Sequence, residues 1–344
     1  MKIAIHPGKG WNRSWIRICE EKNIPHVVLD CYSPTIIKEL KELNVTHLMW
    51  AFSLSYPEDF IVARSVLFSA EKKMGIKVFP NFDTSWHFDD KVAEKYLLES
   101  IGASIVPTWT FFNKKKAIEW LGRYDNFPLV GKLRKGAGSS NVVLLKDFKE
   151  AKKYTNTMFG SGKQPNPSYL LNDISNKISQ TIKRNGLKSV FKKIINMPNK
   201  IKENMEKSNR FNNEKGYVCF QEFISENDND LRISVINNRA WGFYRGVREN
   251  DFRASGSGKI DYETPVPIDL VKYSIDIAKE LNMQSVCFDY VRDKERGYLI
   301  VEISYGFVSS AIFNAAGFWD KKLEFHPGHF YPEELILNDF IGEN

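Results

Sequence analysis

The chain has 344 residues, enough for one large multi-lobed enzyme or two ordinary domains, and its 42% hydrophobic and 13% aromatic content is typical of a globular protein with a buried core. The formal net charge is +7, but the segment 183–215 alone contains ten basic and three acidic residues. The rest of the chain is therefore close to neutral, and the composition does not indicate nucleic-acid binding.

The N-terminal segment and the cysteines exclude further classes. The apolar run after Met1 is too short for a secretory signal, and no later window is long enough to span a membrane, so we expect a cytoplasmic protein. The cysteines lack the close spacing of zinc sites or disulfide frameworks, which predicts reduced core thiols. They are Cys19, Cys31, Cys219 and Cys287.

The N-terminal quarter alternates short apolar runs with helix-like stretches. Strands are expected near 2–5, 26–30, 47–52 and 76–81, and helices over 15–22, 35–43 and 59–74. This β-α-β-α-β order predicts a small parallel sheet with covering helices.

A capped helix and a hairpin are expected next. Asp89 or Asp90 can cap a helix whose apolar residues follow the helical period, and Gly102 can end it. Two apolar strands then flank the turn KGAGSS at 135–140, which predicts a hairpin.

The segment 152–214 is rich in Lys, Asn and Ser, with apolar residues at helical spacing. We expect an inserted amphipathic helical element at about 155–214, broken at Pro198. Strand patterns follow near 217–224, 231–238, 240–247, 285–291 and 298–304, with a helix over 269–281. This half is expected to be α+β with a mostly antiparallel sheet.

The first candidate for chemistry is a loop that could bind phosphate. Lys132 is followed by Lys135 and the Gly/Ser turn 136–140. Glycines let a backbone approach a polyphosphate closely, and exposed amides, hydroxyls and lysines donate to it. A purely structural hairpin turn is the alternative.

The second candidate is an acidic pair. A hairpin centred near Glu295–Arg296 would make Asp289 and Glu302 cross-strand partners on one face. Like charges in that position destabilise a sheet unless a cation lies between them, and Mg²⁺ prefers carboxylate oxygens. The alternative is that each carboxylate pairs with a nearby lysine or arginine.

Two polar segments complete the set. Arg245, Arg248, Arg253 and Lys259 gather in one region between strands, where an anion would hold them together; a solvated loop is the alternative. The strand end QEFI, at 221–224, could offer backbone groups to an adenine edge, or could be any edge strand.

In order, these motifs resemble the ATP-grasp superfamily, which includes glutathione synthetase and D-alanine–D-alanine ligase. The matched series is DK with a helix and G-x-x-x-x-P-T, the lysine strand and Gly/Ser loop, QEFI, D-L-R, R-A-S-G-S-G-K, F-D and V-E-I-S. It covers roughly residues 90–309. The implied fold is α/β and α+β: a small parallel-sheet pre-ATP-grasp domain (1–89), then a two-lobed ATP-grasp domain. Its lobes are expected at 90–220, with the helical insert, and at 221–344, with the magnesium site and a C-terminal tail.

The resemblance also implies roles for individual residues. Those expected to bind ATP are Lys91, Lys132, Lys135, Gly136, Gly138, Ser139, Ser140, Gln221, Glu222, Phe223, Ile224 and Asp230. Those expected to assist phosphoryl transfer are Arg232, Arg253 and Lys259, and those expected to hold Mg²⁺ are Asp289, Glu302 and Ser304. The family's last motif is commonly E-x-N, so with Ser304 at its third position one or two magnesium ions stay open. A hydroxyl, a water or Asn314 could replace the missing amide.

The implied activity is ATP- and Mg²⁺-dependent activation of a carboxylate as an acylphosphate, followed by attack of an amine. The acid would be a small molecule or a glycan carboxylate, because residues 317–335 look like tails of ATP-grasp proteins from bacterial surface-polysaccharide clusters. His87, His326 and His329 could touch the acceptor or be structural. The alternatives are a kinase with the same fold and a non-catalytic nucleotide-binding protein whose basic insert contacts the inner face of the membrane. GKG after KIAI is a fragment of the Gly-rich dinucleotide fingerprint and offers a dehydrogenase as a further, weaker alternative. The oligomeric state stays open, with a dimer as one candidate.

Overall fold

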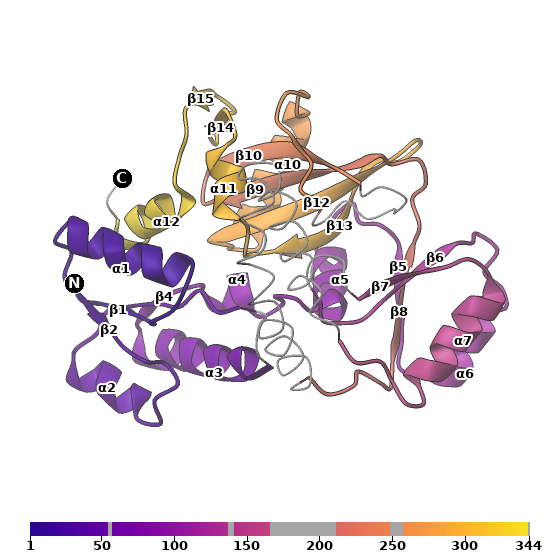
Figure 1. The fold of residues 1–344 in the computed structure, drawn as a ribbon, viewed down its shortest axis with the longest axis horizontal. Coiled ribbons are helices and arrows are strands. Elements are labelled where there is room, and N and C mark those ends of the chain that lie inside the picture. The colour runs from indigo at the N-terminus through magenta and orange to yellow at the C-terminus, as the bar shows by residue number, and fades with distance from the viewer. Residues whose placement is uncertain (54–56, 137–140, 166–210, 248–256, 343–344) are drawn as a thin grey trace, which may run out of the picture.

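The computed structural model describes residues 1–53, 57–136, 141–165, 211–247 and 257–342. Its strands form three sheets, which occupy separate places in Figure 1. The parallel N-terminal sheet lies at the left, and the antiparallel sheet of β5 to β8, called the four-stranded sheet below, lies at the right. The expected combination of a parallel α/β unit with mostly antiparallel sheets is confirmed. Within the described residues, no helix is both long enough and apolar enough to cross a membrane.

The N-terminal domain contains the predicted parallel sheet, in the strand order β2-β1-β3-β4. Its strands are β1 (Ile3–Ile5), β2 (His26–Val28), β3 (His47–Met49) and β4 (Lys77–Phe79), and its helices are α1 (Trp11–Glu21), α2 (Ile36–Glu42) and α3 (Pro57–Met74). Helix α1 begins four residues before the expected start, directly after Gly10, whose φ of 62° suits glycine at this turn.

The C-terminal helix α12 (Pro332–Ile341) packs beside α1, although the two are at opposite ends of the chain (Figure 1). Ile336, Leu337 and Phe340 are buried in the same core as β1. The indole nitrogen of Trp15 donates to the carbonyl of Glu333 at 3.0 Å. This packing ties the end of the chain to the N-terminal parallel sheet and its helices.

The four-stranded sheet has the order β5-β8-β6-β7 and is antiparallel. Its strands are β5 (Thr108–Phe111), β6 (Leu129–Lys132), β7 (Val142–Leu145) and β8 (Val218–Glu222), with α6 (Lys114–Leu121) and α7 (Phe148–Met158) packed against them. The predicted β6–β7 hairpin is confirmed, whereas β5 and α6 had not been predicted.

The start of the predicted insert is corrected by α7. Residues 155–158 belong to this helix, whose N-terminus is capped by the Asp147 side chain, so an excursion can begin only after Met158. An isolated antiparallel bridge joins Lys163 to Glu214 and brings the two ends of that excursion together. The rest of the predicted amphipathic element, with its proposed membrane contact, lies outside the described residues.

The largest sheet has seven strands, and β13-β12-β9-β10-β14-β15 is its main path, with β11 paired to β10. These strands are β9 (Asn229–Ile236), β10 (Arg239–Gly246), β11 (Ile260–Asp261), β12 (Ser285–Asp293), β13 (Gly297–Ser304), β14 (Gly317–Trp319) and β15 (Phe325–Pro327). The remaining helices are α4 (Phe82–Ser85), α5 (Lys91–Ser100), α10 (Ile268–Glu280) and α11 (Ser309–Phe313). Helices α5 and α10 share one apolar core with this sheet, to which α5 contributes Leu98.

Candidate functional site

The strand alternation of the large sheet separates an apolar face from a charged face. Ile233 and Phe288 point into the core beneath α10, so their sequence neighbours Arg232 and Asp289 point to the opposite face. Asp289 is paired directly with Arg232 on β9 and with Glu302 on β13. The predicted register, with Asp289 and Glu302 as cross-strand partners, is therefore confirmed.

Four charged residues on β9, β10 and β12 form what we call the arginine network: Asp230, Arg232, Arg245 and Asp289. Arg232 Nε and Nη2 donate to Asp289 Oδ1 and Oδ2 at 2.7 and 2.9 Å, and Arg245 Nη2 reaches Asp289 Oδ2 at 2.8 Å. Arg245 Nε donates to Asp230 Oδ1 at 2.7 Å. Burial alone would raise the pKa of Asp289, but Arg232 and Arg245 outweigh it and hold that pKa well below its usual range. Two cations balance two anions.

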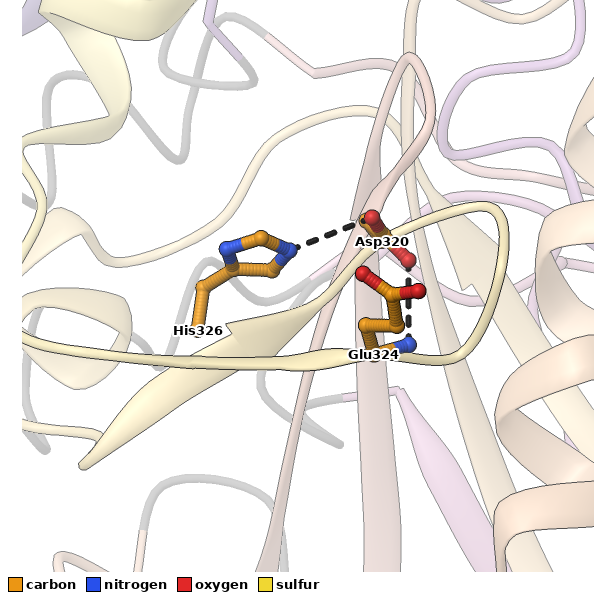
Figure 2. Close-up of side chains that lie close together, drawn as sticks. All are labelled: Asp320, Glu324 and His326. Atoms are coloured by element: carbon orange, nitrogen blue, oxygen red, sulfur yellow. Dashed lines mark hydrogen bonds and ion pairs between the residues drawn. The ribbon is translucent and has the colours of Figure 1, made fainter.

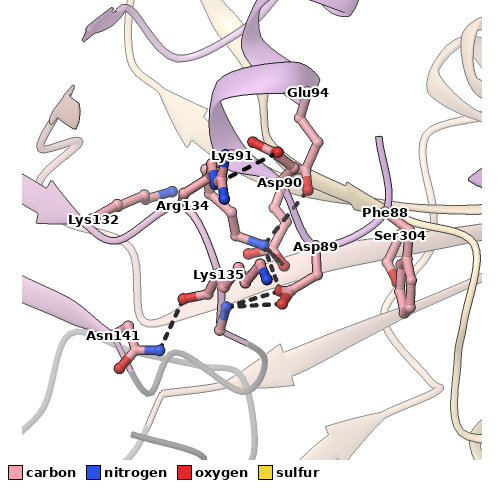
Figure 3. A network of polar contacts seen from close by, with 12 residues as sticks. Phe88, Asp89, Asp90, Lys91, Glu94, Lys132, Arg134, Lys135, Asn141 and Ser304 are labelled. Atoms are coloured by element: carbon pink, nitrogen blue, oxygen red, sulfur yellow. Dashed lines mark hydrogen bonds and ion pairs between the residues drawn. The ribbon is translucent and has the colours of Figure 1, made fainter. Parts of the chain in front are cut away.

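Glu302 belongs to a second group, the lysine network of Asp89, Lys91, Glu94 and Glu302. The ammonium of Lys91 lies 2.9 Å from Glu302 Oε1, 3.3 Å from Asp89 Oδ1 and 3.5 Å from Glu94 Oε1. Figure 3 shows Asp89 and Glu94 on either side of Lys91. Burial opposes the charge of Lys91, but its three carboxylate neighbours raise its pKa well above the ordinary value. One cation is shared among three carboxyl groups.

Local structure explains how α5 supplies two of these groups. The Asp90 carboxylate accepts a hydrogen bond from the Ala93 amide and caps the helix, which places Lys91 at its first position. Glu94 is three residues further and so lies on the same face. Burial raises the pKa of Glu94 to about 8 and that of Asp89 to about 6, because Lys91 offsets only part of the cost of ionising them.

Lys132, at the end of β6, is a buried cation with little compensation. Its side chain is 5% exposed, and in the described part of the chain its ammonium makes one long hydrogen bond, of 3.5 Å, to the carbonyl of Val301. Burial lowers its pKa, and the repulsion of Lys91 adds to this, while Glu302 opposes both. An under-paired buried ammonium costs free energy unless an anion joins it.

A cavity between the four-stranded and seven-stranded sheets brings many of the predicted residues together. Those that line it are Lys132, Gln221, Glu222, Phe223, Ile224, Asp230, Asp289 and Glu302. Six valines also line it, which the sequence analysis did not identify: Val106, Val130, Val142, Val247, Val291 and Val301. Val130 could have been found, because it precedes Lys132 by two residues on the same strand and so shares its face. The cavity combines an apolar wall with charged groups.

Glu222 is fixed at the rim of this cavity by two donors. Arg296 Nη1 and Nη2 donate to its carboxylate at 2.7 and 3.1 Å, and Asn126 Nδ2 donates at 3.1 Å. Arg296 lies in the β12–β13 turn, whereas Glu222 ends β8. This ion pair therefore joins the two sheets beside the QEFI strand end.

The Gly/Ser loop is described only at its first residues. The amide of Gly136 donates to both carboxylate oxygens of Asp89 at 3.0 Å, and the ammonium of Lys135 lies 4.8 Å from the ring centre of Phe60 on α3 (Figure 3 shows the Asp89 contact). The predicted site residues Gly138, Ser139, Ser140 and Arg253, and also Arg248, lie outside the described residues.

Two other predicted residues lie beside the cavity rather than in its wall. The exposed Lys259 donates to the carbonyl of Val247 at 3.3 Å. Ser304 Oγ donates to the carbonyl of Gly306 at 3.0 Å and accepts from its amide at 3.2 Å, so this hydroxyl is engaged in the turn after β13. Asn314 is at the C-terminal cap of α11.

The histidines that had been weighed as acceptor contacts lie elsewhere. His87 is fully buried, and among the described residues neither of its ring nitrogens has a hydrogen-bond partner. Burial lowers its pKa to about 3, so it is a neutral interior residue. His329 contacts the carbonyl of Phe313. Figure 2 shows His326 and Glu324 turned toward Asp320 on the β14–β15 hairpin, where His326 Nε2 is 3.1 Å from Asp320 Oδ2. These three could ligate a metal ion, but β9 and β10 lie between their hairpin and β12 in the sheet.

Comparisons with known proteins agree with this architecture. A family model described as a RimK-like ATP-grasp domain matches residues 168–311. The biotin carboxylase domain of Hydrogenobacter thermophilus 2-oxoglutarate carboxylase, solved with MgADP, ADP and bicarbonate, is similar over 100% of this chain and 70% of its own, with 12% identity and a TM-score of 0.57. The ATP-grasp ligase PsnB with its minimal precursor is similar over 99% and 98%, with 11% identity and a TM-score of 0.57.

A RimK-domain ATP-grasp protein from Sphaerobacter thermophilus is similar over 90% of this chain and 93% of its own, with 12% identity and a TM-score of 0.50. No curated protein sequence matches the chain. Residues 168–311 thus match an ATP-grasp family model and the fold is similar to that of solved ATP-grasp proteins, in agreement with the resemblance of the motifs.

Proposed function

We propose that the protein is an ATP- and Mg²⁺-dependent ligase that joins a carboxylate to an amine. The observation that carries this proposal is the cavity itself, where the under-paired ammonium of Lys132 and the carboxylates of Asp289 and Glu302 line one space. Such a set suits a triphosphate, because the ammonium attracts phosphate oxygens and the carboxylates attract the accompanying cation.

The nucleotide would lie with its adenine against residues 221–224 and the valines, since an aromatic base gains from an apolar wall and from fixed backbone groups. Asp230 would face the ribose. The phosphates would extend toward Lys132 and Lys91, covered by the loop that begins at Lys135 and Gly136. Gly138, Ser139 and Ser140 would donate to them from the same loop.

The carboxylates differ in how well they fit a magnesium ion. A carboxylate offers about four lone-pair positions. Three are used on Asp289 by Arg232 and Arg245, whereas one is used on Glu302 by Lys91. Glu302 would therefore be the principal protein ligand, with Asp289 able to add one position and Ser304 a candidate for a further one. Bound there, the metal would neutralise charge on the phosphate oxygens.

In the proposed reaction, a carboxylate oxygen attacks the γ-phosphorus and ADP leaves, which gives an acylphosphate. The amine nitrogen then attacks the carbonyl carbon, phosphate leaves with the bonding electrons, and the nitrogen loses a proton to form the amide. Arg232 and Arg253 would stabilise the charge on the transferring group, and Lys259 would assist at the rim. Positioning and charge stabilisation of this kind carry most of the catalysis in phosphoryl transfer.

We also propose domain boundaries near residues 89 and 220, a cytoplasmic location and a glycan or small-molecule acid as substrate. Support for a glycan acid comes only from the resemblance of residues 317–335 to tails of polysaccharide-cluster proteins.

ADP release should be measured with a panel of acids and amines. Release that requires both an acid and an amine supports ligation, and release that ignores the amine contradicts it. A phosphorylated product that survives hydroxylamine would instead indicate a kinase, because acylphosphates do not survive it.

A further inference from the structure

Lys91 occupies one of the two carboxylates proposed to bind the metal. Its ammonium lies 2.9 Å from Glu302 Oε1, and its side chain is 8% exposed, so the contact is largely shielded from water. An ammonium and a divalent cation on the same carboxylate repel each other strongly at contact distance, even though further lone pairs of that carboxylate are free. A cation that binds Glu302 therefore drives the displacement of Lys91.

The surroundings of Lys91 make that displacement inexpensive. Asp89 Oδ1 is 3.3 Å and Glu94 Oε1 is 3.5 Å from the same ammonium, so Lys91 keeps two carboxyl partners when it leaves Glu302. Neither partner lies on β13: Asp89 precedes α5 and Glu94 is within it. Lys91 can thus move away from the strand and remain paired.

The arginine network offers no such freedom. Asp289 is held by both nitrogens of a two-pronged contact with Arg232 and by Arg245, and all three side chains come from adjacent strands of one sheet. The pairing of these strands fixes the backbone positions of both arginines beside Asp289, so neither has another carboxylate segment to move away with. The two carboxylates therefore differ in whether their cation can be exchanged.

Resting on the function proposed above, we propose that Lys91 is a positioning residue that guards Glu302. Its ammonium neutralises this carboxylate and excludes free divalent cations, and it passes to the phosphates when the nucleotide delivers the metal. The metal consequently enters together with the nucleotide, and the protein has little affinity for the free ion.

The test is a titration of the folded protein with Mn²⁺ in the absence of nucleotide, followed by electron paramagnetic resonance of the free ion. Lys91→Met should bind Mn²⁺ at least about tenfold more tightly than the wild type, an effect of the size seen when groups around a metal site are changed. Lys91→Arg, which keeps the charge, should bind as weakly as the wild type. Lys95→Met is the matched control, because Lys95 lies one turn further along α5 and pairs with Glu99 instead.

The gain must depend on Glu302, so Lys91→Met combined with Glu302→Gln should lose it. An unchanged affinity in Lys91→Met, or a gain that persists without Glu302, would overturn the proposal. If Lys91→Met does not fold, the same criteria apply to Lys91→Met with Glu94→Gln, which removes one anion with the cation. A separate titration of the wild type with ADP and Mg²⁺ distinguishes failure of the proposed function from failure of this inference. Absence of ADP binding would refute the nucleotide site, whereas the Mn²⁺ result concerns only the role of Lys91 at Glu302.

Discussion

The two ion networks meet at neighbouring residues of one sheet but have opposite charge balance. The arginine network contains two cations for two carboxylates, and the lysine network contains one cation for three. Their origins differ as well: adjacent strands supply the first, whereas Asp89, α5 and β13 supply the second. A balanced network on one sheet stabilises a fixed arrangement, and an unbalanced network assembled from separate segments is suited to accept a further cation.

The largest difference in unfolding free energy is expected between Asp289→Asn and Glu302→Gln. Both should reduce ATP turnover about 100-fold or more, because each weakens charge stabilisation at the phosphates. Asp289→Asn leaves Arg232 and Arg245 buried with one anion fewer and should cost about 3 to 5 kcal/mol of unfolding free energy. Glu302→Gln leaves Lys91 with two carboxyl partners and should therefore cost less unfolding free energy than Asp289→Asn. Urea unfolding of both variants measures this, and equal losses would refute the distinction.

A second, smaller effect concerns His87, which adjoins the lysine network. Burial, with the charges of Arg64 and Lys91, lowers its pKa from 6.5 to about 3. Between those values the unfolded chain binds more protons than the folded one, so stability is lost as the pH falls below about 6.5. Relative to His87→Leu, the wild type should lose about 1 to 2 kcal/mol between pH 7.5 and pH 5. Thermal unfolding at both pH values measures it, and parallel pH profiles would contradict the neutral buried state.

The smallest effect is expected at the rim of the cavity, where Arg296 in the β12–β13 turn holds Glu222. Arg296→Ala removes a half-exposed ion pair, so stability should change by less than about 1 kcal/mol. The QEFI strand end loses its link to the β12–β13 turn, and KM for ATP should rise about tenfold with little change in kcat. Lys294→Ala, two residues earlier in the same turn, is the control. A change in kcat with KM unaltered would place the role of Arg296 elsewhere.

The contrast between the networks also explains what could be predicted from the sequence. The pairing of Asp289 with Glu302 follows from the position of a single turn, because register across a hairpin is a local property. The contact of Lys91 with Glu302 joins residues 211 positions apart, and no local pattern encodes it. Glu94 could have been suspected from its helical spacing to Lys91. The packing of α12 on α1 depends likewise on tertiary contacts, and its apolar residues indicate only that one helix face is buried.

Lys132 tests the central claim most directly, because its ammonium is buried in the cavity and makes a single long hydrogen bond within the described parts of the chain. Titration calorimetry with ADP and Mg²⁺ should show binding to the wild type and to Lys146→Met, an exposed charge control at the end of β7. Lys132→Met should bind about 100-fold more weakly while its unfolding free energy stays equal or rises, since removing an under-paired buried charge relieves its desolvation cost. Equal affinities of Lys132→Met and the wild type would contradict a nucleotide site in this cavity.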